Sequence, residues 1–295
     1  MKINSLRAIF PIAAVTLALS AISCGNKKIT PPQISGPQEA PVAFRTDSIS
    51  WTDSVKAGKN SAICRISVDY PAEGPDSLVG TLRQWIAAQL SASNFVSPDQ
   101  SAPYSPDTAM LSDGKALIAG IGRTVLDNTL PELRELDSLN IGPDMQYEYY
   151  WNITPVYQNG KAITYGNASY CYLGGAHGGA SYSPQVFRMT DGRLFGWADM
   201  FIPDSIPALR QLVKESLRTT YFDAPSESAF KDALLINPDT LPLPQAQPYF
   251  TADGVVFTYG QYEIAPYASG MPSCTLPYAV ARPLMTPEAA QLIAE

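Results

Sequence analysis

Histidine and cysteine are scarce in this chain: His177 is the only histidine, and there are four cysteines. Zinc sites need three or four protein ligands close together, and no cysteine pair lies near His177. We therefore expect neither a metal site nor another cofactor. Basic residues are scattered and fewer than acidic ones, 20 against 27, so the chain lacks the basic patch that nucleic acid binding requires.

The chain also lacks an apolar run that could span a membrane, which takes about 20 residues. The run from Ala8 to Ile22 is shorter, follows a short basic start, and is followed by Ser23 and Cys24. This pattern predicts a signal peptide over residues 1–23, with Cys24 as the lipid-carrying first residue of the mature protein. An ordinary secreted protein with an incidental Cys24 is the alternative.

Residues 24–41 contain four prolines and little apolar content, so we expect a semi-extended linker between the lipid and the folded body. Loss of Lys2 and Arg7 with the signal takes the net charge from −7 to −9. We therefore predict that the protein is exported and anchored to a membrane by its N-terminal lipid. The pair Lys27-Lys28 beside the lipid site favours the periplasmic face of the envelope over the cell surface.

Three cysteines remain beyond Cys24, an odd number for an oxidising compartment: Cys64, Cys171 and Cys274. Cys171 and Cys274 both lie in strand-like segments, so one bridge between them is a hypothesis. Three buried thiols acting as small hydrophobic side chains are an equally supported alternative.

Strand patterns come in hairpins and helical patterns come singly, which predicts an α+β fold: a mainly antiparallel sheet of hairpins with packed helices. Strands are expected over residues 44–55, 62–70, 147–157, 162–173, 185–189, 254–259 and 274–280. Helices are expected over residues 76–92, 113–139 (with a break), 209–217, 226–236 and from 286 onward. We place one α+β subdomain at residues 42–155 and a second at residues 156–295. For the first helix, Asp76 or Ser77 is the expected cap.

Two segments resemble a known family. The first is Tyr172-Leu-Gly-Gly-Ala-His-Gly178; the second runs from Phe250 through Tyr262-Glu-Ile-Ala-Pro-Tyr267 to Tyr278. Together they resemble the RsiV-like domain, a domain of unknown function in the extracytoplasmic part of lysozyme-sensing anti-sigma factors and in bacterial lipoproteins. Residues 62–167 are similar to the companion domain that precedes PdaC-type peptidoglycan deacetylases. The resemblance implies lysozyme-like proteins as partners.

The departures from that resemblance limit what it implies. We find no sigma-binding segment and no spanning helix after the signal. The deacetylase needs its own domain with metal-binding histidines, and His177 stands alone. Neither activity is therefore expected of this chain.

The same two segments hold the candidate binding residues: Gly174, Gly175, His177, Gly178, Tyr262, Glu263, Pro266 and Tyr267. We expect them to bind a protein or a glycan such as peptidoglycan, with Trp197 as a further wall of an aromatic platform, and we assign no catalytic residue. The alternative is an envelope glycan hydrolase that uses Glu263 and His177. Both loops also have a purely structural interpretation, in which the glycines form a turn and Glu263 accepts hydrogen bonds from loop amides.

A short triplet, Asp followed by Ser or Thr and a small or aliphatic residue, occurs seven times. It resembles the O-glycan acceptor of exported proteins in one group of Gram-negative bacteria. The candidate acceptors are Ser48, Ser54, Ser77, Thr108, Ser138, Ser205 and Thr240. Capping of helices and turns by Asp and Ser is the alternative explanation, because Asp76 and Asp204 lie where helices should begin.

Overall fold

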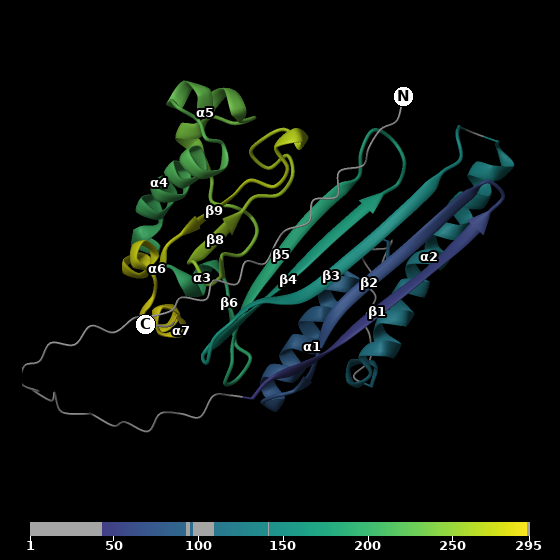
Figure 1. Cartoon of the computed structure of the whole chain (residues 1–295), viewed down its shortest axis with the longest axis horizontal. Helices are drawn as coiled ribbons and strands as arrows, with labels where there is room; N and C mark the ends of the chain where they lie inside the picture. The colour runs from purple at the N-terminus through teal and green to yellow at the C-terminus, as the bar shows by residue number, and fades with distance from the viewer. Residues whose placement is uncertain (1–42, 93–94, 97–108, 141, 294–295) are drawn as a thin grey trace, which may run out of the picture. The chain divides into compact units, whose positions relative to one another are not determined.

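The computed structural model describes residues 43–92, 95–96, 109–140 and 142–293 (Figure 1). Pro41–Glu295 forms one compact unit. The predicted signal peptide, Cys24 and the linker lie outside the described residues, as does Thr108. Within the described ranges, none of the helices combines the length and the apolar character needed to cross a membrane.

A six-stranded sheet is built from strands that neighbour one another in sequence order. Its strands are β1 (Arg45–Ala57), β2 (Asn60–Glu73), β3 (Gln146–Gln158), β4 (Ala162–Tyr172), β5 (Gly179–Arg188) and β6 (Leu194–Phe195). Neighbouring strands pair antiparallel, except β2 and β3, which run parallel. A parallel pair needs a long crossover, and α1 (Asp76–Ser91) and α2 (Gly114–Ser138) supply it.

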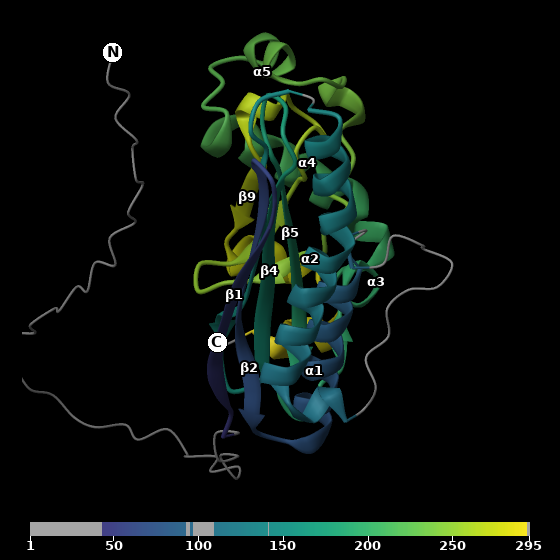
Figure 2. The ribbon, with the colours of Figure 1, turned by 90° about the vertical axis from the view of Figure 1, so that its right-hand side faces the viewer.

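The two crossover helices lie against one face of this sheet (Figure 2). Alternate side chains of β2 point toward them and form the floor of a core cluster: Ala62, Cys64, Ile66, Val68 and Tyr70. From α1, the predicted apolar stripe of Leu78, Leu82 and Ile86 is fully buried against it. The hydrophobic periodicity therefore placed these elements correctly.

Helix α2 is continuous, contrary to the predicted break. Gly122 lies beneath the indole of Trp51 on β1, so close that a Cβ there would meet the ring at 2.0 Å. The glycine therefore serves close packing between helix and sheet instead of ending the helix. Asp113 accepts a hydrogen bond from the amide of Ala116 and caps the start of α2.

The expected cap of α1 was wrong. The N-cap position is Pro75, and no side chain caps the helix, so neither Asp76 nor Ser77 fills that role.

The C-terminal residues pack around a small antiparallel sheet and form a second hydrophobic cluster. Its strands are β7 (Tyr249–Phe250), β8 (Val255–Thr258) and β9 (Ser273–Leu276). The helices of this part are α3 (Trp197–Met200), α4 (Ile206–Ser216), α5 (Glu227–Ala233), α6 (Tyr278–Ala281) and α7 (Pro287–Leu292). The helix expected from residue 286 onward is α7, which has Thr286 as its cap and Pro287 in its first turn.

Strands β4 and β5 are shared by two hydrophobic clusters. Ala162 and Val186 point into the C-terminal cluster, whereas their neighbours Ile163 and Phe187 point into the cluster under α1 and α2. The predicted subdomain boundary at residues 155 and 156 falls inside β3, in the middle of the continuous sheet. The α+β class with mainly antiparallel pairing is confirmed.

The proposed Cys171–Cys274 bridge is not formed: Cys64, Cys171 and Cys274 are free thiols. Cys171 packs on the cluster under α1 and α2, whereas Cys274 on β9 is buried in the C-terminal cluster. Burial raises the pKa of Cys64 and Cys274 to about 12, which makes both thiols poor nucleophiles. The alternative of three buried thiols holds for Cys64 and Cys274, whereas Cys171 is only half-buried.

Candidate binding site

The two loops expected to carry the site lie together in the fold. His177 follows β4, and its Nε2 lies 3.2 Å from the hydroxyl of Tyr262, 85 residues further along the chain. The ring of Tyr267 stacks on the imidazole with centroids 3.7 Å apart and planes 18° from parallel. We call His177, Tyr262 and Tyr267 the aromatic cluster. Tyr262 is 54% exposed, so the cluster is accessible at the surface.

Glycines shape the loop that presents His177. Gly174 and Gly175 both have φ of +85°, a region that residues with a Cβ rarely occupy. Gly178 fits closely against the sheet, where a Cβ would lie 2.4 Å from the Tyr170 ring. The carbonyl oxygen of Gly178 lies 3.0 Å from Nδ1 of His177, so both imidazole nitrogens have hydrogen-bond partners, Gly178 for Nδ1 and Tyr262 for Nε2.

Tyr262 is held in a left-handed conformation, with φ of +63°. A non-glycine residue in this region is uncommon and must be held by its surroundings. The turn from Gly260 to Glu263 closes with a backbone hydrogen bond of 3.2 Å. Gln261 ties the same turn to the sheet by accepting a hydrogen bond of 2.8 Å from the amide of Ala180.

Glu263 braces the loop. Its Oε2 accepts from the amide of Gly260 at 2.7 Å, and its Oε1 accepts from the amide of Gln245 at 2.8 Å. Both carboxylate oxygens are therefore engaged by backbone donors. This arrangement matches the structural interpretation of Glu263 and leaves the carboxylate poorly placed to act as an acid or a nucleophile.

Pro266 opens the short turn that carries Tyr267. The turn spans Tyr267–Ser269 and ends at Gly270, whose φ is +68°. The hydroxyl of Tyr221 donates to the carbonyl of Ser269, which fixes the far side of the turn. Pro266 itself is exposed beside the aromatic cluster.

Trp197 is not part of the aromatic platform. Its ring packs against Phe201 and Phe257, and its indole N–H donates to the carbonyl of Ala246 at 3.0 Å. The proposed binding surface is therefore confined to the two loops. Among the described residues, no group of three or more His, Cys, Asp or Glu side chains is arranged to hold a metal ion.

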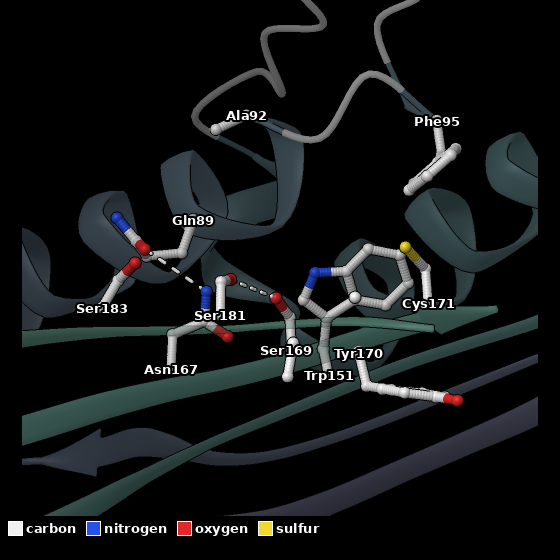
Figure 3. A pocket seen from close by; sticks show the side chains of 12 residues that line it. Gln89, Ala92, Phe95, Trp151, Asn167, Ser169, Tyr170, Cys171, Ser181 and Ser183 are labelled. Carbon is white, nitrogen blue, oxygen red and sulfur yellow. Dashed lines mark hydrogen bonds between the residues drawn. The ribbon is translucent and has the colours of Figure 1, made fainter. Parts of the chain in front are cut away.

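A polar groove lies between α1 and the sheet, and sequence reasoning missed it. It consists of two adjoining hollows of about 420 and 440 Å³ that share Gln89, Ser181 and Ser183. We call it the α1–β5 groove. Figure 3 shows the first hollow, with Gln89, Asn167 and Ser183 on one side and Trp151 and Cys171 on the other.

The pairing register of β4 and β5 explains why the floor of the groove is polar. Asn167 pairs with Ser183, and Ser169 pairs with Ser181, so four polar side chains gather on one face of β4 and β5. Ser169 and Ser181 hydroxyls lie 2.7 Å apart. A polar residue at every second position of two paired strands, on the face that a helix covers, could have predicted this site.

Comparison with known proteins gives a family match for one of the two loops. Residues 198–279 match the family model described as a protein of unknown function (DUF3298), so the chain contains a DUF3298 domain that includes Tyr262–Tyr267. The first loop, residues 174–179, lies outside the matched range. The comparison with curated proteins gave no match.

Two solved structures share the fold. A DUF3298 family member from Bacteroides fragilis NCTC 9343 is 19% identical, with a TM-score of 0.69, over 86% of this chain and 99% of that one. A DUF3298 family protein from Pseudomonas aeruginosa PAO1 is 14% identical, with a TM-score of 0.57, over 84% of this chain and 97% of that one. At these identities the comparison shows a common fold alone.

Proposed function

We propose that this protein is a non-catalytic, lipid-anchored protein of the cell envelope that binds a protein partner through the aromatic cluster. The observation that supports this best is the mutual contact of His177, Tyr262 and Tyr267, which come from two loops distant in sequence and lie at the surface. Preorganised aromatic side chains lose little conformational entropy on binding and are enriched at the energetic centres of interfaces.

The proposed cellular location rests on the N-terminal sequence. A signal over residues 1–23, acylation of Cys24 and a proline-containing linker would tether the unit Pro41–Glu295 to the periplasmic side of a membrane.

Lysozyme-like proteins are the partner class we propose. The resemblance to the RsiV-like domain is carried by the segments that contain the aromatic cluster, and the mature charge of −9 would attract a basic partner. Such attraction should weaken with salt, because surface charges are screened over about 10 Å at 0.1 M ionic strength.

The hydrolase alternative has less support. Glycosidic cleavage needs two carboxyl groups about 5 to 9.5 Å apart. Glu263 uses both oxygens to hold loop amides, and the two nitrogens of His177 are occupied by Gly178 and Tyr262. A hydrolase would have to release these contacts before it could act.

Calorimetric titration of residues 41–295 with a basic c-type lysozyme tests the proposal, with purified peptidoglycan titrated in parallel. We expect saturable binding of lysozyme without glycan cleavage by this protein. Tyr262→Ala should weaken binding at least tenfold, about 1.4 kcal/mol, because a central aromatic contact is lost.

Tyr150→Ala is the matched control, because Tyr150 is an exposed tyrosine on β3 outside the cluster. It should leave the affinity unchanged. Equal affinities for wild type and Tyr262→Ala, or no binding of lysozyme at all, would rule out the proposed partner surface.

A further inference from the structure

The α1–β5 groove has the chemistry of a site for an uncharged, hydrogen-bonding ligand. Its walls carry amides and hydroxyls, among them Gln89, Gln185 and Gln247. No lysine or arginine lines either hollow in the described part of the chain. The one carboxylate, Glu263, is already engaged by two backbone amides. An anionic ligand would find no counter-charge here.

Asn167 on the groove floor has an unsatisfied hydrogen-bonding group. The residue is 5% exposed, and its Nδ2 donates to Oε1 of Gln89 at 3.3 Å. Its Oδ1 has no partner among the described residues. Exchanging oxygen and nitrogen in both amides would still leave one polar atom of Asn167 unpaired. A buried polar atom without a partner costs about 1–3 kcal/mol, so a ligand that donates to it is favoured.

Apolar surface lies beside these polar groups. Trp151, which is 5% exposed, forms one end of the first hollow (Figure 3). Trp85 lines the second hollow and is half-buried, and its ring packs edge-on against Phe187 and Tyr165. Each hollow falls within the range of about 300 to 1,000 Å³ typical of small-molecule sites. Sugar rings combine hydroxyls at the rim with apolar C–H faces, which suits a site of amides, hydroxyls and tryptophans.

An extended peptide fits this groove less well. Pairing as an added strand needs free amides on the outer edge of β5. On that edge the amide of Ala180 donates to Gln261, that of Arg188 donates to the carbonyl of Arg193, and Pro184 has no N–H. The edge is therefore closed to a continuous main-chain ladder, and recognition must come from the side chains of the sheet face.

We propose that the α1–β5 groove binds a neutral glycan chain that carries acetamido groups. The acetamido N–H donates to Asn167 Oδ1, sugar hydroxyls exchange hydrogen bonds with Ser169, Ser181 and Gln89, and an apolar ring face lies on the half-buried Trp85. This binding does not depend on the protein partner proposed for the aromatic cluster, because the two use different side chains.

The probe is a hexamer of β-1,4-linked N-acetylglucosamine, titrated into residues 41–295 by calorimetry. The comparison ligand is the hexamer of β-1,4-linked glucose, which has the same linkage and no acetamido group. We expect the acetylated hexamer to bind at least tenfold more tightly. Asn167→Ala should lower its affinity at least tenfold, because the acceptor Oδ1 is lost, and the thermal midpoint of the variant checks that it stays folded without the Asn167–Gln89 hydrogen bond.

Ser181→Tyr provides a second variant at an exposed position and should block the wall shared by the two hollows. Ser50→Tyr is its matched control, because Ser50 is an exposed serine of a cross-strand hydroxyl pair on β1, away from the groove. Failure of the folded wild type to bind the acetylated hexamer would overturn the proposal. Equal affinity for both hexamers, unchanged binding by both groove variants, or loss of hexamer binding in Tyr262→Ala would also overturn it.

Discussion

The sole histidine lies where its two neighbours leave it little freedom. The imidazole of His177 is stacked by Tyr267 and contacted by the hydroxyl of Tyr262, in a loop that Gly178 allows to lie close to Tyr170. Burial raises the pKa of the Tyr170 phenol, and the charge of Glu148 adds to this, so Tyr170 stays neutral beneath the loop. These contacts give the cluster its preorganisation.

Two glycines in helices make a matched test of packing. We predict that Gly122→Ala lowers the free energy of unfolding by about 1–3 kcal/mol, because the added Cβ displaces the Trp51 ring. Gly80→Ala on α1 has open space around the new Cβ and should raise it by about 0.5–1 kcal/mol. Urea unfolding of both variants measures the difference; equal changes would show that Trp51 is not tightly packed on α2.

The seven acceptor triplets are a separate question at this scale. Helix capping does not account for Asp76 or Asp204, because neither α1 nor α4 has a side-chain cap. The described acceptors that are exposed are Ser48, Ser54, Ser77, Ser138 and Thr240. Ser205 is half-buried, and its hydroxyl donates to the carbonyls of Ile202 and Leu284.

We predict O-glycans at the exposed acceptors and little or none at Ser205. Glycopeptide mapping and intact mass of the natively expressed protein check this. A mass equal to the lipidated polypeptide alone would end the hypothesis.

At the scale of the elements, salt bridges join the β5–β6 turn to α7. Arg188 and Arg193 both donate to Oε1 of Glu288, at 2.7 and 2.6 Å, and Arg188 also holds Asp191 in a two-pronged contact. The hydrogen bonds from Arg188 lower the pKa of Asp191 from 3.8 to about 2. A lowered carboxyl pKa means that the folded state gains stability above pH 4 and loses it as the pH falls toward 2.

We predict that Asp191→Asn destabilises the protein at pH 5 by less than about 1 kcal/mol, because the pair is partly exposed. The difference from wild type should shrink toward pH 2. Urea unfolding at both pH values measures it, and Asp232→Asn on the exposed side of α5 is the control. A difference that does not change with pH would contradict the role given to the Arg188 contact.

Individual helices and strands could be predicted from the sequence more reliably than which of them lie side by side in the fold. The strands expected over residues 62–70, 147–157 and 162–173 and the helix expected from 286 onward rest on local patterns, and the structure has strands and a helix there. The parallel pairing of β2 with β3 joins segments separated by two helices, so no local pattern specifies it. The break expected in α2 failed because tertiary packing of Trp51 outweighs the low helix propensity of glycine.

The candidate site, too, could be predicted only in part from the sequence. The loop residues His177, Tyr262 and Tyr267 could be selected from their sequence surroundings, although their mutual contact could not. The α1–β5 groove depends on the register between β4 and β5 and on the position of α1, neither of which is written in a short motif.

At the scale of the whole molecule, the folded unit Pro41–Glu295 carries the two surfaces that we propose for recognition, and the proposed N-terminal lipid would tether it to a membrane. A binding protein of the proposed kind would need stable loops more than a reactive centre, and the bracing of Glu263 by two amides fits that need. The charge of −9 predicted for the mature protein would favour capture of a basic partner through long-range attraction at low salt.

Because the chain has one histidine, a single imidazole signal reports on the aromatic cluster. The most direct test is NMR of the histidine-labelled protein, residues 41–295, during titration with unlabelled lysozyme. The account predicts that the His177 signal shifts and saturates with the calorimetric affinity, and that the shift is lost in Tyr262→Ala and kept in Tyr150→Ala. An unchanged His177 signal at saturating lysozyme would contradict the proposed function.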